Sequence, residues 1–188
     1  MMYTASDLKK GLRIKIDNEP HIVTEFNFVK PGKGQALYRS KLKNMFTGSQ
    51  FERTFRSVDT FESADLQEKK TQFLYKEGEK YCFMDNENYE QFYLTEDQVG
   101  NAKNFLIDNI EAEILMYEDR PLDITLPNFV DLIVTQADPW AKGDTVSGNT
   151  KPVIVQTGYQ IQVPPFIEEG EKIRVDTRTG EYLTRVKG

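Results

Sequence analysis

The sequence predicts a mainly β protein made of three small barrel-like units in series. Short runs of residues alternate between apolar and polar with period two, which is typical of strands with one buried face. Turn residues separate these runs, and one stretch, which begins at Thr95, carries a helix-start signal. A chain of 188 residues has room for two or three small domains. We expect the units to span residues 1–63, 64–127 and 128–188.

The first unit is predicted to be a small β-barrel with one prominent hairpin. Residues 12–17 and 51–56 alternate strictly, whereas residues 21–28 and 35–45 are extended runs rich in β-branched and aromatic side chains. Between the two central runs lies a Pro- and Gly-containing segment, residues 30–34.

The second unit is predicted to be an oligonucleotide/oligosaccharide-binding (OB) barrel. Its short apolar runs cover residues 72–75, 81–84, 91–94, 110–117 and 122–126. Thr95, followed three residues later by Gln98, matches a capping box and predicts a short helix that ends near Leu106, although Gly100 weakens this prediction. Five strands and one helix suit that type of barrel.

The third unit resembles the second in length and strand count, which is consistent with two barrels in series. Pro127 precedes it, and its expected strands cover residues 129–135, 153–156, 159–163, 172–175 and 181–186. Arg178–Gly180 should form a hairpin turn. Residues 137–153 have little apolar content and predict a long loop, of the kind that is usually functional or disordered.

Charge is distributed unevenly along the chain. The net charge is −6, but residues 1–63 carry +4, residues 64–127 carry −9 and residues 128–188 carry −1. Because like charges repel, only the ends of the chain should favour a phosphate-bearing partner. No apolar run is long enough to cross a membrane, and the N-terminus has no secretory signal. The single cysteine, Cys82, excludes an internal disulfide, so the cytoplasm is the expected location.

The hairpin segment presents a lysine at its apex. Pro31 fixes its own φ and favours extended geometry at Lys30, while Gly32 and Gly34 can adopt positive φ on either side of Lys33. The ammonium group of Lys33 would therefore reach outward on a flexible stem, without shielding neighbours. Such a group suits contact with a phosphate or a ribose, and it is accessible to a lysine-modifying enzyme.

The strand after the hairpin carries three more cations. Arg39, Lys41 and Lys43 have the same parity, so they should project from one face. With Lys30 and Lys33 they would form a basic ribbon that follows a nucleic-acid backbone. Considered alone, the same pattern also fits a glycine hairpin with a solvated lysine face.

Several segments together resemble one family. Residues 28–36 (FVKPGKGQA) resemble the tip of the first domain of bacterial elongation factor P. Residues 151–170 (KPVIVQTGYQIQVPPFIEEG) and 176–186 (DTRTGEYLTRV) are similar to its C-terminal signature and closing hairpin. Residues 127–130 (PNFV) and 142–145 (KGDT) are similar to the start and the long loop of its third domain. The resemblance extends over the whole chain, with the motifs in the right order.

The resemblance implies a fold and a function. It implies an N-terminal KOW/SH3-like barrel followed by two OB barrels, in an L-shaped arrangement like tRNA. A monomer of this kind would bind the ribosome between the P and E sites and relieve stalling at consecutive prolines. Lys33 would reach the CCA end of the peptidyl-tRNA. A lysyl-tRNA-synthetase-like ligase would extend Lys33, and Gln35 with Ala36 favours β-lysylation.

The resemblance also suggests further contacts. Gly143, Asp144 and Thr145 would lie near the exit-site codon of the mRNA, and Tyr182 and Arg185 are candidates for tRNA or ribosomal RNA contacts. Trp140 could stack on a base or pack within its loop.

We expect no catalytic residue, cofactor or metal. One His and one Cys cannot supply the usual zinc ligand sets, and no carboxylate spacing suggests calcium. His21 is expected to be a packing or surface residue, and Cys82 a buried small apolar one.

Three alternatives are compatible with parts of the sequence. The elongation factor P-like paralogue usually has arginine at the tip, where this chain has Lys33. The hypusine-bearing initiation factor lacks the third domain that residues 128–188 supply. An enzyme that uses Cys82 or His21 is the alternative from a different functional class.

Overall fold

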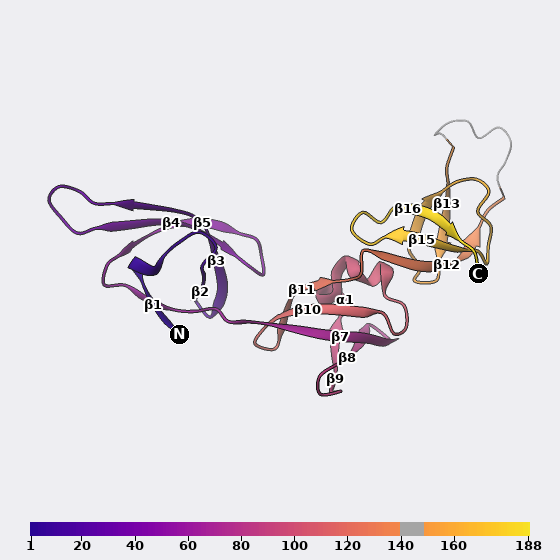
Figure 1. The fold of residues 1–188 in the computed structure, drawn as a ribbon, viewed down its shortest axis with the longest axis horizontal. Coiled ribbons are helices and arrows are strands. Elements are labelled where there is room, and N and C mark those ends of the chain that lie inside the picture. The colour runs from indigo at the N-terminus through magenta and orange to yellow at the C-terminus, as the bar shows by residue number, and fades with distance from the viewer. Residues whose placement is uncertain (140–148) are drawn as a thin grey trace. The chain divides into compact units, whose positions relative to one another are not determined.

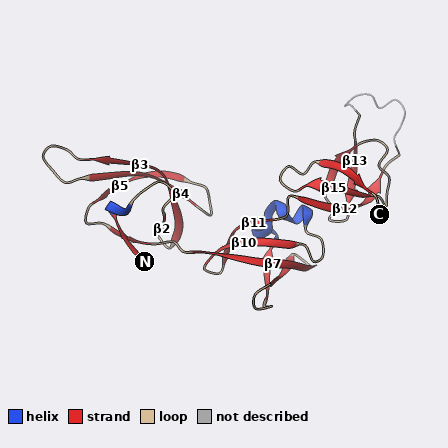
Figure 2. Ribbon diagram, viewed as in Figure 1, coloured by secondary structure: helices blue, strands red, loops and turns tan. Residues whose placement is uncertain are grey.

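The computed structural model describes residues 1–139 and 149–188 (Figure 1). Strands dominate these residues, and the few helical turns are short (Figure 2). The mainly β prediction is therefore confirmed. The chain packs as two compact units: one contains residues 1–67 and 115–122, and the other contains residues 68–114 and 123–188. Among the described residues, no helix has the length and apolarity needed to span a membrane.

The first unit contains one four-stranded sheet and one two-stranded sheet. The large sheet has the order β2-β3-β4-β5, and β1 pairs with β6. The elements are β1 (Met2–Thr4), the 3-10 helix η1 (Ala5–Asp7), β2 (Arg13–Ile16), β3 (Glu19–Val29), β4 (Leu37–Asn44), β5 (Gln50–Arg56) and β6 (Thr60–Glu62). The sequence did not predict β1, η1 and β6, because three residues are too few to establish a period.

The core of the first unit lies on one face of the large sheet. Its fully enclosed side chains include Ile14, Val23 and Leu42, which come from β2, β3 and β4. Residues 115–122 belong to the same unit. There Tyr117 packs edge-on against Phe46, with ring centroids 6.1 Å apart.

The following segment forms a five-stranded sheet with the order β11-β10-β7-β8-β9. Its elements are β7 (Leu66–Glu77), β8 (Lys80–Asp85), β9 (Gln91–Thr95), α1 (Glu96–Val99), the 3-10 helix η2 (Gly100–Phe105), β10 (Glu111–Tyr117) and β11 (Arg120–Thr125). The predicted capping box is present, because Thr95 and Gln98 each accept a hydrogen bond from the other's backbone N–H. Gly100, with φ of 61°, ends the α-helix, and the chain continues as a 3-10 helix.

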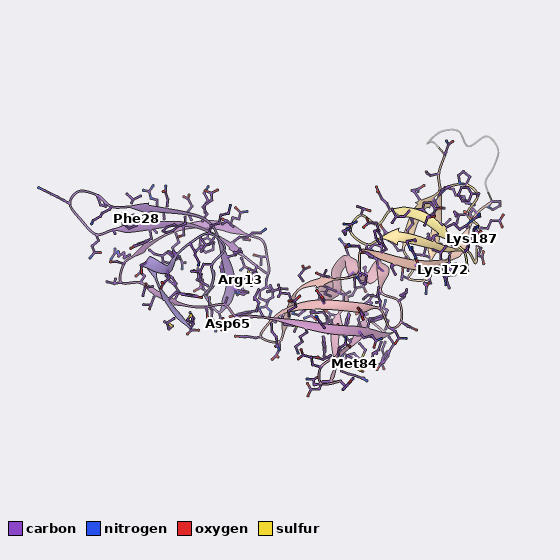
Figure 3. All side chains as sticks on the ribbon, in the orientation of Figure 1. Arg13, Phe28, Asp65, Met84, Lys172 and Lys187 are labelled. Carbon is purple, nitrogen blue, oxygen red and sulfur yellow. The ribbon has the colours of Figure 1, made fainter. Side chains whose placement is uncertain are left out.

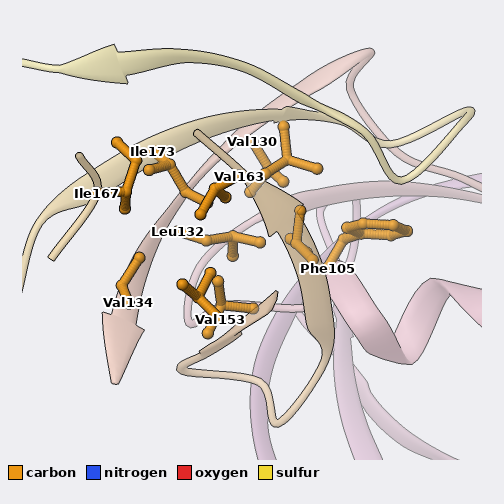
Figure 4. Close-up of a cluster of buried hydrophobic side chains, with 11 residues drawn as sticks. Phe105, Val130, Leu132, Val134, Val153, Val163, Ile167 and Ile173 are labelled. Carbon is orange, nitrogen blue, oxygen red and sulfur yellow. The ribbon is translucent and has the colours of Figure 1, made fainter. Parts of the chain in front are cut away.

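The last segment forms another five-stranded sheet, with the order β14-β13-β12-β15-β16. Its strands are β12 (Phe129–Ala137), β13 (Lys151–Val155), β14 (Gln160–Val163), β15 (Lys172–Asp176) and β16 (Tyr182–Val186). Figure 4 shows the buried side chains between these strands, with Leu132 near the centre. Phe105, at the end of η2, belongs to the same cluster and contacts Tyr159 edge-on.

Candidate functional site

The candidate site is the hairpin formed by β3 and β4, which projects from the first unit (Figure 1). The strands pair as far as Val29 and Leu37, so the tip loop consists of residues 30–36. Lys30 and Lys33 in this loop are exposed. Within the described part of the chain, neither takes part in an ion pair. The ammonium group of Lys33 is therefore free to meet an anionic partner.

The two tip glycines have different backbone conformations. Gly34 has φ of 137°, in the region that side chains other than glycine rarely adopt. Gly32 has no positive φ, and a Cβ added there would meet no atom within 4 Å. The prediction that the chain can use positive φ on either side of Lys33 is thus realised at Gly34 only.

The hairpin is supported on one side and open on the other. β5 pairs with β4 from Lys43 to Leu37, almost the full length of the hairpin. β2 pairs with β3 from Glu19 to Ile22, and beyond Val23 no strand in the described part of the chain pairs with the outer edge of β3. The sheet therefore holds the tip through β4, while β3 presents an accessible edge.

The cations of β4 lie on one face, as the alternation predicts. Arg39 and Lys43 are exposed and Lys41 is half-buried, whereas the intervening side chains are buried. Lys41, however, donates to Glu25 across the sheet at 2.9 Å, and Glu52 lies opposite it on β5. The hydrogen bond and the charge of Glu25 raise the pKa of Lys41 above its ordinary value. Glu25 therefore neutralises the charge of Lys41, the middle of the three cations that β4 contributes to the predicted basic ribbon.

Family models match almost the whole chain in three consecutive parts. The "Elongation factor P (EF-P) KOW-like domain" model matches residues 4–61, and the "Elongation factor P (EF-P) OB domain" model matches residues 66–124. The "Elongation factor P, C-terminal" model matches residues 130–185. The chain belongs to the elongation factor P family. This is a family of translation elongation factors, not of enzymes.

Several curated elongation factor P sequences are similar to this chain over nearly its whole length. Elongation factor P of Syntrophus aciditrophicus is 79% identical over 187 residues, which cover 100% of both chains. Elongation factor P of Desulfotalea psychrophila is 58% identical and covers 99% of this chain and 100% of its own. Elongation factor P 2 of Geobacter sulfurreducens is also 58% identical over 187 residues.

Solved structures share the fold at lower identity. A eukaryotic translation initiation factor 5A from Methanococcus jannaschii matches with a TM-score of 0.55 and 24% identity, over 67% of this chain and 92% of its own. A translation initiation factor eif-5a family protein from Naegleria fowleri matches with a TM-score of 0.57 and 18% identity, over 67% of this chain and 98% of its own. At these identities the likeness shows a common fold.

Other residues that the family resemblance singled out lie outside the hairpin. Tyr182 is half-buried and packs on the core of the C-terminal sheet. Arg185 donates to Glu171 at 3.2 Å and lies over the ring of Phe166. All of these side chains belong to the second unit. Gly143, Asp144, Thr145 and Trp140 lie outside the described residues.

His21 and Cys82, for which no catalytic role is expected, are both packed inside the protein. His21 is buried, its Nδ1 lies 3.0 Å from the carbonyl oxygen of Glu19, and its ring meets Phe51 edge-on. Cys82 is fully buried in β8. The expectation that Cys82 is a buried apolar residue is confirmed, and of the two settings expected for His21, packing or surface, the structure shows packing. Within the described residues, no group of three or more His, Cys, Asp and Glu side chains could hold a metal ion.

Sequence reasoning missed one feature of the hairpin. Phe28, Tyr38 and Phe55 are direct neighbours across β3, β4 and β5. The aromatic residues are visible in the sequence, but their alignment depends on a strand register that spans 27 residues and that local patterns do not specify.

Proposed function

We propose that this elongation factor binds the ribosome between the P and E sites and stimulates peptide-bond formation at consecutive prolines through Lys33. One observation carries this proposal. Lys33 is exposed at the end of a projecting hairpin, and its neighbours offer no carboxylate partner. A free cation at the end of a supported β-hairpin suits insertion into a confined, phosphate-rich site.

The proposed mechanism is positioning rather than chemistry. The hairpin supplies no acid, base or nucleophile, so the ribosome itself joins the amino acids. A contact between Lys33 and the CCA end of the peptidyl-tRNA would hold the reacting groups in a productive geometry and remove an entropic part of the barrier. Each tenfold gain in rate requires only about 1.4 kcal/mol, which charge-assisted hydrogen bonds can supply.

Lys33 is also the proposed site of modification. Its side chain is exposed, and the adjacent glycines leave room for a modifying enzyme. A lysyl-tRNA-synthetase-like ligase would add a β-lysyl group and so extend the reach of the cation. The mass of the native tip peptide tests this: a mass equal to that of the unmodified peptide would contradict a stable adduct.

The remaining contacts complete the proposal. Arg39, Lys41 and Lys43 would face tRNA or ribosomal RNA from the hairpin, and Tyr182 and Arg185 would do so from the C-terminal barrel. Residues 143–145 would approach the exit-site codon of the mRNA. We assign the three domains to residues 1–63, 64–127 and 128–188, as a monomer that mimics tRNA and acts in the cytoplasm.

Replacement of Lys33 tests the function directly. The Lys33→Ala variant should fold like the parent protein, because an exposed lysine makes no contact that folding requires. It should nevertheless lose at least tenfold in rescue of a reporter with consecutive prolines. Lys10→Ala, which removes another exposed lysine of the same unit, is the matched control and should behave like the parent. Equal rescue by Lys33→Ala and the parent would refute the proposed role.

A further inference from the structure

Phe28 is an aromatic residue with half of its side chain in solvent, close to the tip of the hairpin. Its relative exposure is 49%, and Figure 3 labels it on the projecting hairpin. It lies near the end of β3, where β4 is the one strand of the described residues that pairs with β3, so the other edge of β3 has no strand partner among them. Exposure of a large ring at such a position costs free energy unless a partner covers it.

The ring of Phe28 rests on a supporting row of aromatic side chains. Its centroid lies 5.1 Å from that of Tyr38, with an angle of 57° between the planes. Tyr38 is flanked on β5 by Phe55, which is buried and packs against Phe61 at 4.9 Å. The Phe28 ring therefore meets the barrel core indirectly, through its contact with Tyr38, which packs against that core. About half of the Phe28 side chain remains open to solvent.

The charges around this ring favour an anionic partner. Residues 26–40 contain no Asp or Glu, and the tip loop next to Phe28 carries Lys30 and Lys33. Arg39 is paired with Asn27 rather than with Phe28, so its side chain projects from the other face of the hairpin. The nearest acidic residue along β3 is Glu25, which is paired with Lys41. An exposed ring next to two lysines that form no ion pair with the described residues is a combination by which proteins bind single-stranded nucleic acids, through stacking and phosphate contact together.

We propose that Phe28 is a stacking platform for a base of the single-stranded RNA end that Lys33 reaches. This inference rests on the function proposed above and extends it from one residue to a surface. The five-residue step from Phe28 to Lys33 spans at most ~18 Å, so one RNA segment can meet both residues. Phe28 would bind a base while Lys33 acts at the reacting end.

The test compares aromatic and aliphatic residues at position 28. Phe28→Leu keeps the apolar contact with Tyr38 but removes the π face, whereas Phe28→Trp keeps a stacking ring. In the proline-run reporter, Phe28→Leu should raise the factor concentration for half-maximal rescue by about 5-fold to 150-fold, which corresponds to the loss of one stacked base. Phe28→Trp should retain rescue to within about 3-fold of the parent, which is below the smallest loss expected for Phe28→Leu. Phe129→Leu is the control, because Phe129 has the same 49% exposure on β12, outside the hairpin.

Amide hydrogen exchange separates stacking from a structural role. Phe28→Leu should leave the exchange of the Asn27 and Leu37 amides unchanged, whereas loosening of the hairpin would accelerate it. Rescue by Phe28→Leu equal to the parent, or a loss accompanied by faster exchange, would overturn the inference. If Lys33→Ala fails and Phe28→Leu does not, the stacking platform is wrong and the proposed function stands. If Lys33→Ala also rescues, the proposed function itself is wrong.

Discussion

Replacement of Glu25 should strengthen the binding of the hairpin to RNA by releasing Lys41. Glu25 accepts a hydrogen bond from Lys41 at 2.9 Å. It therefore neutralises the charge of a lysine that the sequence assigns to the basic ribbon. The side chains of Glu25 and Lys41 are 67% and 43% exposed, so water screens the pair and it contributes little to folding. Glu25→Gln should therefore fold like the parent while the ammonium group of Lys41 becomes available to phosphate.

The expected size follows from counterion release. For single-stranded nucleic acid, log K falls with log salt by about 0.7 for each phosphate neutralised. Four cations of the hairpin, Lys30, Lys33, Arg39 and Lys43, form no ion pair with the residues that the structure describes. They predict a slope of about −2.8, and a fifth cation brings it to about −3.5. When the salt concentration is lowered from 200 to 50 mM, the affinity of both proteins for RNA rises. The factor by which it rises should be about 2.6 times larger for Glu25→Gln than for the parent. Glu52, which remains opposite Lys41, makes this an upper value.

The assay is fluorescence anisotropy of a labelled single-stranded RNA at several salt concentrations. Glu62→Gln is the control, because it changes the net charge by the same amount in the same unit while Glu62 faces Lys15. The Glu62→Gln slope should match that of the parent. The same salt slope for Glu25→Gln and the parent, or an equal change of slope in Glu25→Gln and Glu62→Gln, would refute the argument. It would show that the ion pair with Glu25 does not keep Lys41 from binding phosphate.

Three further predictions concern stability. Leu132→Ala, in the fully buried core of the C-terminal sheet, should lower the free energy of unfolding by about 2–5 kcal/mol, whereas Ile133→Ala, at a 41% exposed neighbour, should cost clearly less; similar denaturation midpoints for the two would contradict this. Arg178 hydrogen-bonds to Asp176 and lowers the pKa of its carboxyl group. The interaction therefore stabilises the fold fully above about pH 3.9, and this stabilisation is lost as pH falls through the lowered pKa. In a thermal-melting series, Asp176→Asn should therefore lose less stability than the parent on acidification, and parallel curves would count against the ion pair. Thr95→Ala removes the N-cap of α1 and should cost about 0.5–2 kcal/mol, measured by chemical denaturation; an unchanged midpoint would argue against the cap.

The family of this chain and the character of its tip are properties of the sequence. The period-two runs, the capping pair Thr95 and Gln98, and the cations Arg39, Lys41 and Lys43 on one face all depend on residues within a few positions of one another. Local backbone geometry decides such features, so the order of residues along the chain is enough to infer them.

The tertiary structure alone decided which side chains meet. Pairing of β3 with β4 and β5 places Glu25 against Lys41 and aligns Phe28 with Tyr38 and Phe55. A shift of one residue in either register would turn these side chains to the other face, and the sequence of one strand does not specify its register with another. For this reason the sequence predicted a continuous basic ribbon. The folded hairpin instead combines a compensated centre, a free cationic tip and a supported aromatic ring.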